Sequence, residues 1–229
     1  MKKIERSVHF MLKVVFFVIL ALTAVGLAGT RDDEGPLFRS VYLTLVNKTH
    51  KLPDNWEDKV QIDAVTNFFG EEVQIERKTH EQFQLLREDL NGRGINIGFG
   101  SAYCSTGVCQ QLWEEYLNKY GEEYAAGHCA APGYSEHQTG LAIDIHVLKE
   151  GKLIGSRVVR VSDEDKQDFV KIIYGLLPKY GFILRYPEGK EDITGHTYEP
   201  WHLRYIDSPK IAKKIAKEGL TLEEYLGEY

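Results

Sequence analysis

The sequence has little of what would mark several classes of protein. Its 229 residues include only 3 cysteines, so a scaffold built from disulfides is excluded, and it has no internal repeat, low-complexity tract or linker rich in Pro, Gly or Ser. An excess of positive charge is also missing, because 28 Lys and Arg stand against 34 Asp and Glu, a net charge of −6. Without a basic surface the chain is not attracted to a phosphate backbone, so we expect no nucleic-acid partner.

What the sequence does have is the composition of a folded domain. Hydrophobic residues make up 43% and aromatic residues 11%, which is enough for a full core, and the 27% of charged residues intersperse both signs. A length of 229 residues corresponds to one domain of ordinary size. These values exclude a disordered, collagen-like or coiled-coil chain.

The beginning of the chain differs from the rest and is set aside from the fold. Four basic residues come first, Lys2, Lys3, Arg6 and Lys13, and an uncharged apolar run follows at 14–29. This order is typical of a signal peptide or a membrane anchor, and Ala28 offers a small residue for cleavage. We expect residues 1–30 to be a leader helix that exports the chain and, if it stays uncleaved, holds it at the membrane. Residues 31–56 are then a lead-in segment, and 57–229 the working domain outside the cytoplasm.

Periodicity and capping signals divide the rest of the chain into strands and helices. Alternation of apolar residues predicts strands at 41–46, 95–99, 141–147, 182–186 and 202–206. Helical spacing and capping residues predict helices at 79–91, 108–120 and 162–177, two more beginning at Ser208 and Thr221, and a long loop at 125–140. Strands and helices mix without a steady β-α-β alternation, so the sequence predicts one α+β domain.

Two segments carry residues that are typical of a catalytic zinc site. One runs from Ser135 to Asp144 and includes His137, and the other runs from Glu199 to His202. Two imidazoles and one carboxylate leave a zinc ion one open position for water, which distinguishes catalytic zinc sites from closed structural ones. Asp144 supports this interpretation because it lies in an otherwise apolar predicted strand, where an unpaired carboxylate would be costly and a cation is its natural partner.

Glu199 is the candidate for the general base. It lies three residues before His202, close enough to approach a metal without being a ligand. Water bound to zinc loses its proton near neutral pH, and a neighbouring carboxylate can accept that proton and return it to a leaving amine. The sequence therefore predicts Zn²⁺ held by His137, Asp144 and His202, with Glu199 as the catalytic residue.

The two segments together resemble a known family. The pattern S-x-H-x-x-G-x-A-x-D at 135–144, followed by E-x-W-H at 199–202, is similar to the zinc D-alanyl-D-alanine carboxypeptidases of the vancomycin-resistance type. Further similar stretches are L-V-N-K at 45–48 and G-F-I-L-R-Y-P at 181–187. The resemblance implies the same ligands and base, and a small antiparallel-sheet α+β zinc-peptidase fold with flanking helices, shared with lysostaphin-type enzymes.

The chain departs from this family at two positions. Where the family usually has an arginine and, a few residues later, a glutamine, this sequence has Cys104 and Cys109. The resemblance implies that the arginine steadies the substrate carbonyl or the oxyanion, and a neutral thiol cannot replace its charge or its donors. Losing one such donor commonly costs about 100- to 1000-fold in rate. Arg185 or Arg204 could supply another cation, since Arg204 lies on the same predicted strand face as His202.

Other side chains near these motifs are candidates for substrate binding or for support of the ligands. We expect Ser135 and Arg185 to bind substrate, Arg185 through the terminal carboxylate, although an arginine commonly pairs with a surface carboxylate instead. His146 shares a strand face with Asp144, as an alternative ligand or as a supporting residue.

The cysteines allow several arrangements. His128 beside Cys129, with Cys104 and Cys109, does not fit a standard zinc spacing. A spacing of five residues near a helix start is awkward for a direct bridge between Cys104 and Cys109. We expect free or buried thiols, and among possible bridges one to Cys129 is favoured.

The motifs predict an exported monomeric metallopeptidase, and the family resemblance implies that it removes the C-terminal D-alanine from peptidoglycan stem peptides. Three alternatives stay open. The enzyme could be an L,D-carboxypeptidase that acts on tetrapeptide stems or an endopeptidase, or the chain could be a zinc-retaining module that binds wall peptides with impaired catalysis.

Overall fold

The computed structural model describes residues 40–128, 130–149, 152–154 and 172–229. The predicted leader, most of the helix predicted at 162–177, and Cys129 lie outside these ranges, as do residues 31–39 of the lead-in segment. No helix in the described part of the chain combines the length and apolar character that spanning a membrane requires.

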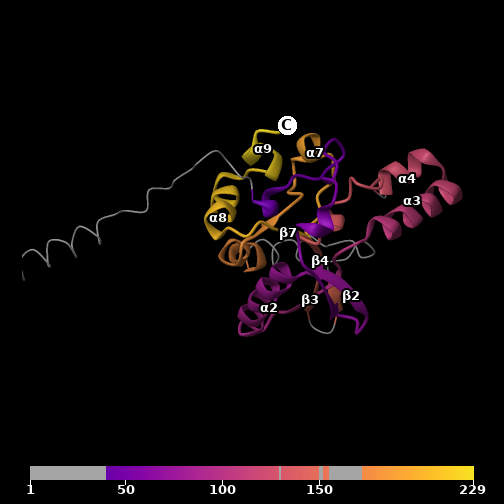
Figure 1. Cartoon of the computed structure of the whole chain (residues 1–229). Helices are drawn as coiled ribbons and strands as arrows, with labels where there is room; N and C mark the ends of the chain where they lie inside the picture. Colours follow the sequence, from indigo (N-terminus) through magenta and orange to yellow (C-terminus); the bar gives the residue numbers. More distant parts are fainter. Residues whose placement is uncertain (1–39, 129, 150–151, 155–171) are drawn as a thin grey trace, which may run out of the picture. The chain divides into compact units, whose positions relative to one another are not determined.

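The central element is a small antiparallel sheet (Figure 1). Its strands follow the order β3 (Asn96–Ser101), β4 (Ala142–Lys149), β7 (His202–Tyr205) and β6 (Phe182–Leu184), and β5 (Lys152–Ile154) also pairs with β4. In the pairing of β4 with β7, Asp144 lies opposite His202. These strands match four of the five that alternation predicts, so the α+β class with a small antiparallel sheet is confirmed.

The two faces of the sheet have opposite characters, because side chains alternate along each strand. On one face, Ile143, Ile145 and Leu203 belong to the main core, which also contains Phe83 and Leu86 from α2 (Arg77–Asn91). The other core members include residues of α6 (Tyr174–Leu176) and η5 (Leu177–Tyr180). The opposite face of β4 and β7 carries polar side chains, and it is this face that holds the site.

The segment before the sheet does not form the strand predicted at 41–46. It contains instead a short 3-10 helix, η1 (Val41–Leu43). The Nη2 atom of Arg204 donates to the backbone carbonyls of Tyr42 and Thr44, at 3.2 and 2.7 Å. A guanidinium group, rather than a neighbouring strand, thus satisfies these carbonyls. The segment therefore needs no strand partner, and the strand predicted from its apolar alternation does not form.

A hairpin and several short helices complete the chain. The hairpin of β1 (Ile62–Thr66) and β2 (Glu72–Glu76) was not predicted, and η2 (Trp56–Asp58) precedes it. The short helix α7 (Glu191–Thr194) follows β6. The helices α8 (Pro209–Glu218) and α9 (Leu222–Leu226) follow β7. The caps predicted for the last two are confirmed, since Ser208 caps α8 and Thr221 with Glu224 forms a capping box on α9.

The helix predicted at 79–91 corresponds to α2, which begins two residues earlier, at Arg77, and has Glu76 as its N-cap residue. The carboxylate of Glu76 accepts hydrogen bonds from the backbone N–H groups of Lys78 and Thr79, at 3.1 and 2.8 Å. Thr79 was expected to be the capping residue, but its hydroxyl donates to Glu76 instead. A glutamate after an extended residue can reach the first turn of a helix in the same way as a shorter side chain.

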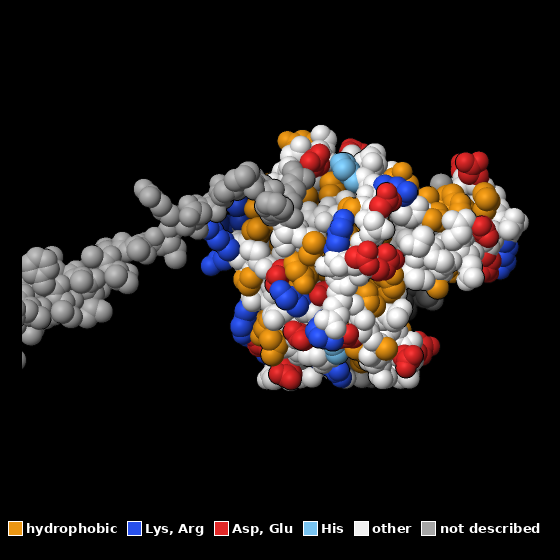
Figure 2. All heavy atoms as spheres, viewed as in Figure 1, with side chains coloured by type: hydrophobic (Ala, Val, Ile, Leu, Met, Phe, Trp, Pro, Cys, Tyr) orange, Lys and Arg blue, Asp and Glu red, His pale blue; other side chains and the backbone are white. Residues whose placement is uncertain are grey.

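The helices α3 (Thr106–Tyr120) and α4 (Glu122–His128) lie side by side and extend away from the strands (Figure 1). We call this pair the α3–α4 arm. Only Cys109 is buried within α3, while Val108 and Leu112 are 49% and 41% exposed. Hydrophobic and acidic side chains are visible on the surface of the arm, beside basic side chains and much backbone and other polar surface (Figure 2). The arm and η3 (Glu136–Thr139) replace part of the long loop predicted at 125–140.

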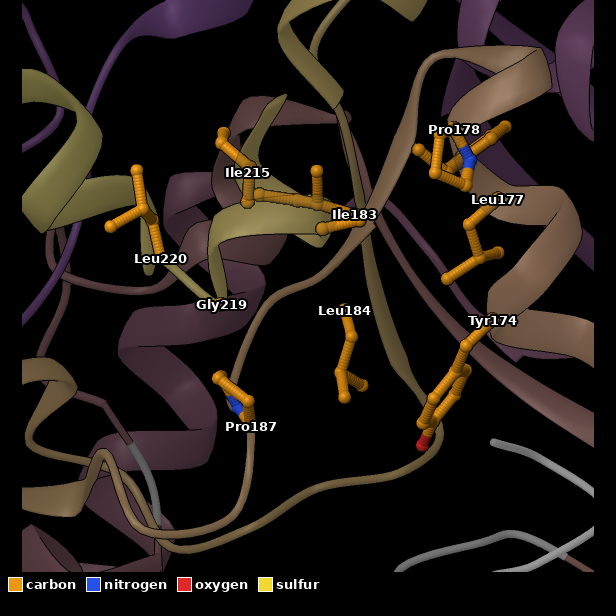
Figure 3. A pocket seen from close by; sticks show the side chains of 11 residues that line it. Tyr174, Leu177, Pro178, Ile183, Leu184, Pro187, Ile215, Gly219 and Leu220 are labelled. Carbon is orange, nitrogen blue, oxygen red and sulfur yellow. The ribbon is translucent and has the colours of Figure 1, made fainter. Parts of the chain in front are cut away.

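An apolar pocket lies among η5, β6 and α8 (Figure 3). Leu177, Ile183, Leu184, Ile215 and Leu220 contribute to its lining. None of the polar side chains described in the next section lines it, so we assign no chemistry to this pocket.

Candidate active site

The sheet register and one glycine bring three predicted ligands together. Asp144 on β4 and His202 on β7 are cross-strand partners, so their side chains leave the same face side by side. His137 lies in η3, which ends at Gly140 with a φ of +73°. A Cβ at this position would lie 2.7 Å from Ile62 Cδ1, so only glycine fits where the chain turns from η3 into β4.

The three side chains form a buried cluster whose ligand atoms all lie within 4.8 Å of one another. The Nδ1 atom of His202 is 3.0 Å from Asp144 Oδ1, and the Nε2 atom of His137 is 3.5 Å from the same oxygen. Ligands around a tetrahedral zinc ion are about 3.4 Å apart, given zinc–ligand distances near 2.1 Å. The spacing of the donors therefore suits a single ion.

Each imidazole is oriented by a hydrogen bond at its other nitrogen. His137 Nδ1 lies 2.7 Å from the carbonyl oxygen of Ala102, so its Nε2 faces the cluster. His202 Nε2 lies 3.0 Å from Glu136 Oε2, so its Nδ1 faces the cluster. Metal-binding histidines are typically held by a carbonyl or a carboxylate at the remote nitrogen, which fixes the ring and its tautomer.

Two buried polar atoms beside the cluster have no hydrogen-bond partner in the described part of the chain. They are His137 Nε2 and Glu199 Oε2. Glu199 Oε2 lies 3.8 Å from His202 Nδ1, which faces the cluster. Glu199 Oε2 and His137 Nε2 are therefore both next to the cluster of ligand atoms. Buried polar atoms without partners are uncommon, and a cation with a water molecule would satisfy both of them. The donor set and these two atoms therefore fit a zinc ion with an open coordination position.

The charge around the cluster depends on Glu136, which is buried at the start of η3 and bonded to side chains of β7 and to Arg185. Glu136 Oε1 accepts from Arg185 Nε and Arg204 Nη1, both at 2.7 Å. Burial by itself would raise the pKa of Glu136, but the two guanidinium groups outweigh it and hold the pKa well below the ordinary value. Glu136 is thus a buried anion that links the histidine ligand to two cations. Its role could not be predicted from the motif, although it stands directly before His137.

Asp144 and His202 influence each other in the same way. Burial opposes ionisation of Asp144, but His137 and His202 outweigh this and lower its pKa well below the ordinary value. Burial also opposes the charged form of His202, but Asp144 and Glu136 raise its pKa to about 9 in the absence of a metal. Asp144 is therefore an ionised carboxylate, which is the form that binds a cation.

The two arginines do not meet a substrate, which corrects the expectation from the sequence. Arg185 is 0% exposed, and its Nη1 and Nη2 atoms donate to both carboxylate oxygens of Glu223, at 2.9 and 2.6 Å. Arg204 is also 0% exposed and is bonded to Glu136 and to the carbonyl of Thr44. Since neither guanidinium reaches the surface, Arg185 does not receive a substrate carboxylate, and neither arginine replaces the missing cation.

Aromatic rings pack beside the His202 ligand. Tyr186 is buried, with its ring centroid 4.8 Å from that of His202 and 4.2 Å from that of His196. Burial, with the charges of His202 and Lys48, lowers the pKa of His196 to about 4. Tyr186 therefore holds the ligand ring in place, and His196 is kept neutral at ordinary pH.

Ser135 and His146 lie near the cluster but are not part of it. Ser135 is partly exposed directly before η3, and its carbonyl accepts from the N–H of Gln138 at 3.1 Å. His146 lies on the same face of β4 as Asp144, and its ring packs against Phe69 with centroids 4.9 Å apart. The described cluster of possible metal ligands does not include His146, so its position fits a packing role.

Cys104 and Cys109 form a disulfide with each other, contrary to the expectation of thiols or a link to Cys129. Cys104 precedes the N-cap residue Ser105, and Cys109 lies in the first turn of α3. This turn brings the two Cα atoms to 6.1 Å, within the usual range for a disulfide. The helix start, which made the spacing look awkward in an extended chain, is what brings the cysteines together.

Comparisons with known proteins agree with this geometry. The family model described as VanY, D-alanyl-D-alanine carboxypeptidase, matches residues 72–208. The chain is 37% identical over 187 residues to YodJ of Bacillus subtilis, covering 80% of this chain and 66% of that protein. It is 36% identical to the bifunctional D-Ala-D-Ala dipeptidase and carboxypeptidase VanXYC of Enterococcus gallinarum, covering 80% of this chain and 92% of that protein. The match thus spans just under two thirds of YodJ.

Solved structures give the same result. The LdcB LD-carboxypeptidase superposes with a TM-score of 0.65 at 34% identity, covering 80% of this chain and 85% of that one. A vancomycin-resistance D,D-pentapeptidase, VanY, in complex with Zn(II) superposes with a TM-score of 0.63 at 31% identity, covering 81% of this chain and 99% of that one.

Proposed function

Because the chain belongs to the VanY family of D-alanyl-D-alanine carboxypeptidases, we propose that it is a zinc peptidase that removes the C-terminal D-alanine from peptidoglycan stem peptides. The observation that supports this most is the cluster of His137, Asp144 and His202 with the unpartnered Glu199 Oε2 beside it. Three relatives are named for action on D-Ala-D-Ala, and the VanY structure contains Zn(II). The donor set is the one that a catalytic zinc ion prefers.

In this proposal the protein contributes ligands, orientation and a base. A zinc ion in such a site polarises a carbonyl group and makes water acidic near neutral pH. The carboxylate of Glu199 accepts the proton of the attacking water at Oε2 and passes it to the leaving amine. Its position is fixed because its backbone N–H donates to the carbonyl of Tyr186 at 3.2 Å, and its carbonyl accepts from the N–H of His202 at 3.1 Å.

The surroundings of the ligands serve the same chemistry. The Ala102 carbonyl and the Glu136 carboxylate fix the two imidazoles, so that little reorganisation is needed when the ion binds. We further propose that Ser135, which is partly exposed at the start of η3, contacts the substrate.

The remaining parts of the proposal concern the whole protein. We propose that the enzyme acts outside the cytoplasm, where its substrate lies, with residues 1–30 as signal peptide or membrane anchor and 57–229 as the zinc carboxypeptidase domain. A disulfide between Cys104 and Cys109 suits an oxidising compartment. We expect the enzyme to act as a monomer.

The test is the isosteric variant Glu199→Gln, assayed on a peptide that ends in D-Ala-D-Ala. We expect kcat to fall about 1000-fold while one zinc ion per chain is retained, because the variant loses the base and keeps all three ligands. Glu72→Gln, an exposed substitution on β2, is the matched control and should leave kcat unchanged. Zinc retained with undiminished turnover in Glu199→Gln would overturn the assignment of the base.

A second candidate is an L,D-carboxypeptidase. The similarity to LdcB and to an L,D-carboxypeptidase DacB favours it, at 34% and 31% identity. Incubating the zinc-loaded protein with pentapeptide and tetrapeptide stems, and weighing the products, separates the two activities. Loss of D-alanine from the pentapeptide alone supports D,D-cleavage, whereas loss from the tetrapeptide alone supports L,D-cleavage.

A further inference from the structure

The segment at 101–106 positions the His137 ligand. It makes three hydrogen bonds to η3, the short helix that carries His137. The Ala102 carbonyl lies 2.7 Å from His137 Nδ1, the Cys104 N–H donates to the His137 carbonyl at 3.1 Å, and Gln138 Nε2 donates to Thr106 Oγ1 at 3.2 Å. Any shift of this segment therefore moves the ring that faces the cluster.

The same segment is the root of the α3–α4 arm, and in the described side chains of the arm α3 buries little of its surface against the core. Only Cys109 is buried within α3, and Val108 in the first turn is 49% exposed. The first turn is capped by Ser105, whose hydroxyl accepts from the Val108 N–H at 3.3 Å. A helix with so little buried apolar surface has little stabilisation from packing. The Cys104–Cys109 disulfide thus links the 101–106 segment covalently to the first turn of α3.

We propose that the Cys104–Cys109 disulfide is a positioning element of the active site, which holds the 101–106 segment and thereby His137, so that its reduction impairs catalysis. This inference rests on the proposed function. A bridge that closes so short a loop restricts the unfolded chain only modestly, so its main effect is expected on local geometry rather than on global stability.

Reduction of the bridge follows ordinary thiol–disulfide exchange. A thiolate of a dithiol reductant attacks one sulfur and forms a mixed disulfide, and its second thiol then displaces the protein. The reductant becomes a disulfide, while Cys104 and Cys109 together gain two electrons and two protons. For the experiment a phosphine is preferable because dithiols bind zinc. It becomes a phosphine oxide with oxygen from water, and the sulfurs gain the same electrons and protons.

The experiment compares oxidised and phosphine-reduced protein by three measurements. Steady-state kinetics separates kcat from KM, the visible spectrum of the Co²⁺-substituted protein reports the geometry at the metal, and hydrogen exchange of the metal-free protein reports opening of residues 101–106. Thiol titration must first show two more thiols per chain after reduction. We expect kcat to fall about tenfold with a smaller change in KM, a shifted cobalt spectrum, and faster exchange of the segment.

Two variants serve as controls. Cys104→Ser/Cys109→Ser should match the reduced protein and not respond to reductant, whereas Cys129→Ser should respond like the unaltered chain. Fully reduced protein with unchanged kcat, cobalt spectrum and exchange would overturn the inference. If the oxidised protein does not hydrolyse any stem peptide, the proposed function fails, but the cobalt spectrum and the exchange rates still decide the role of the disulfide.

Discussion

Replacing Glu136 by glutamine tests whether the buried anion stabilises the fold and the metal site together. Glu136 belongs to a group of four buried charged side chains. Glu136 and Glu223 carry two negative charges, and Arg185 and Arg204 carry two positive charges. Glu136→Gln keeps the shape of the side chain but leaves two buried guanidinium groups against one carboxylate. Removing one partner of a buried ion pair costs about 3–5 kcal/mol, and we expect a loss of unfolding free energy near the lower end because the amide oxygen still accepts a hydrogen bond.

The same substitution should weaken the metal site. The Glu136 carboxylate accepts from His202 Nε2 at 3.0 Å and raises the basicity of the ring, which a neutral amide does less well. Loss of such a partner typically lowers metal affinity about 10- to 100-fold. Zinc affinity is measured by competition with a chelating dye.

The unfolding measurement needs metal-free protein, because a bound ion stabilises the native state by mass action and would mix the two effects. Urea unfolding at pH 7 of Glu136→Gln is compared with that of Glu72→Gln, which lies exposed on β2 and should change stability by less than about 0.5 kcal/mol. If Glu136→Gln loses less than about 1 kcal/mol and binds zinc as tightly as the unaltered chain, the view of Glu136 as the central anion is refuted.

Three further substitutions test the surroundings of the site. The pKa of His196 is lowered to about 4, so the stability that it contributes is complete above its unfolded pKa of about 6.5 and is lost as pH falls toward 4. His196→Phe should therefore reduce the difference in unfolding free energy between pH 7 and pH 4.5 by about 2 kcal/mol, and an unchanged difference contradicts this. Gly140→Ala, which forces a Cβ against Ile62 at a φ of +73°, should lower the unfolding free energy by about 2 kcal/mol or more in urea titrations. Trp56→Phe removes the donor to the buried Thr139 carbonyl at 2.9 Å and should cost about 1–3 kcal/mol by the same assay.

The parts of the site that follow a local pattern could be predicted from the sequence. Alternation at 141–147 indicated both the strand β4 and the isolated polar face that carries Asp144. The motif residues His137 and His202 were expected beside it, and the structure brings their ligand atoms within 4.8 Å of those of Asp144. Their roles in catalysis stay predictions until the variants are measured.

The parts that depend on distant partners could not be predicted in this way. Arg185 is neutralised by Glu223, which lies 38 residues further along the chain, and no local spacing indicates that pair. The strand expected at 41–46 is absent because its backbone carbonyls accept hydrogen bonds from Arg204. Arg204 lies 160 residues after Thr44 in the chain. The disulfide was missed for the opposite reason, since its geometry is local but arises only once the first turn of α3 has formed.

The ion pair between Arg185 and Glu223 joins the last helix of the chain to the interior of the enzyme. Glu223 lies on α9, only six residues before the exposed terminal residue Tyr229. A chain that stops before Leu222 would therefore lose the carboxylate that pairs with both Nη atoms of the buried Arg185, and Arg185 would keep its bond to Glu136. An affinity tag fused after Tyr229, which is 82% exposed, extends into solvent and leaves this pair intact.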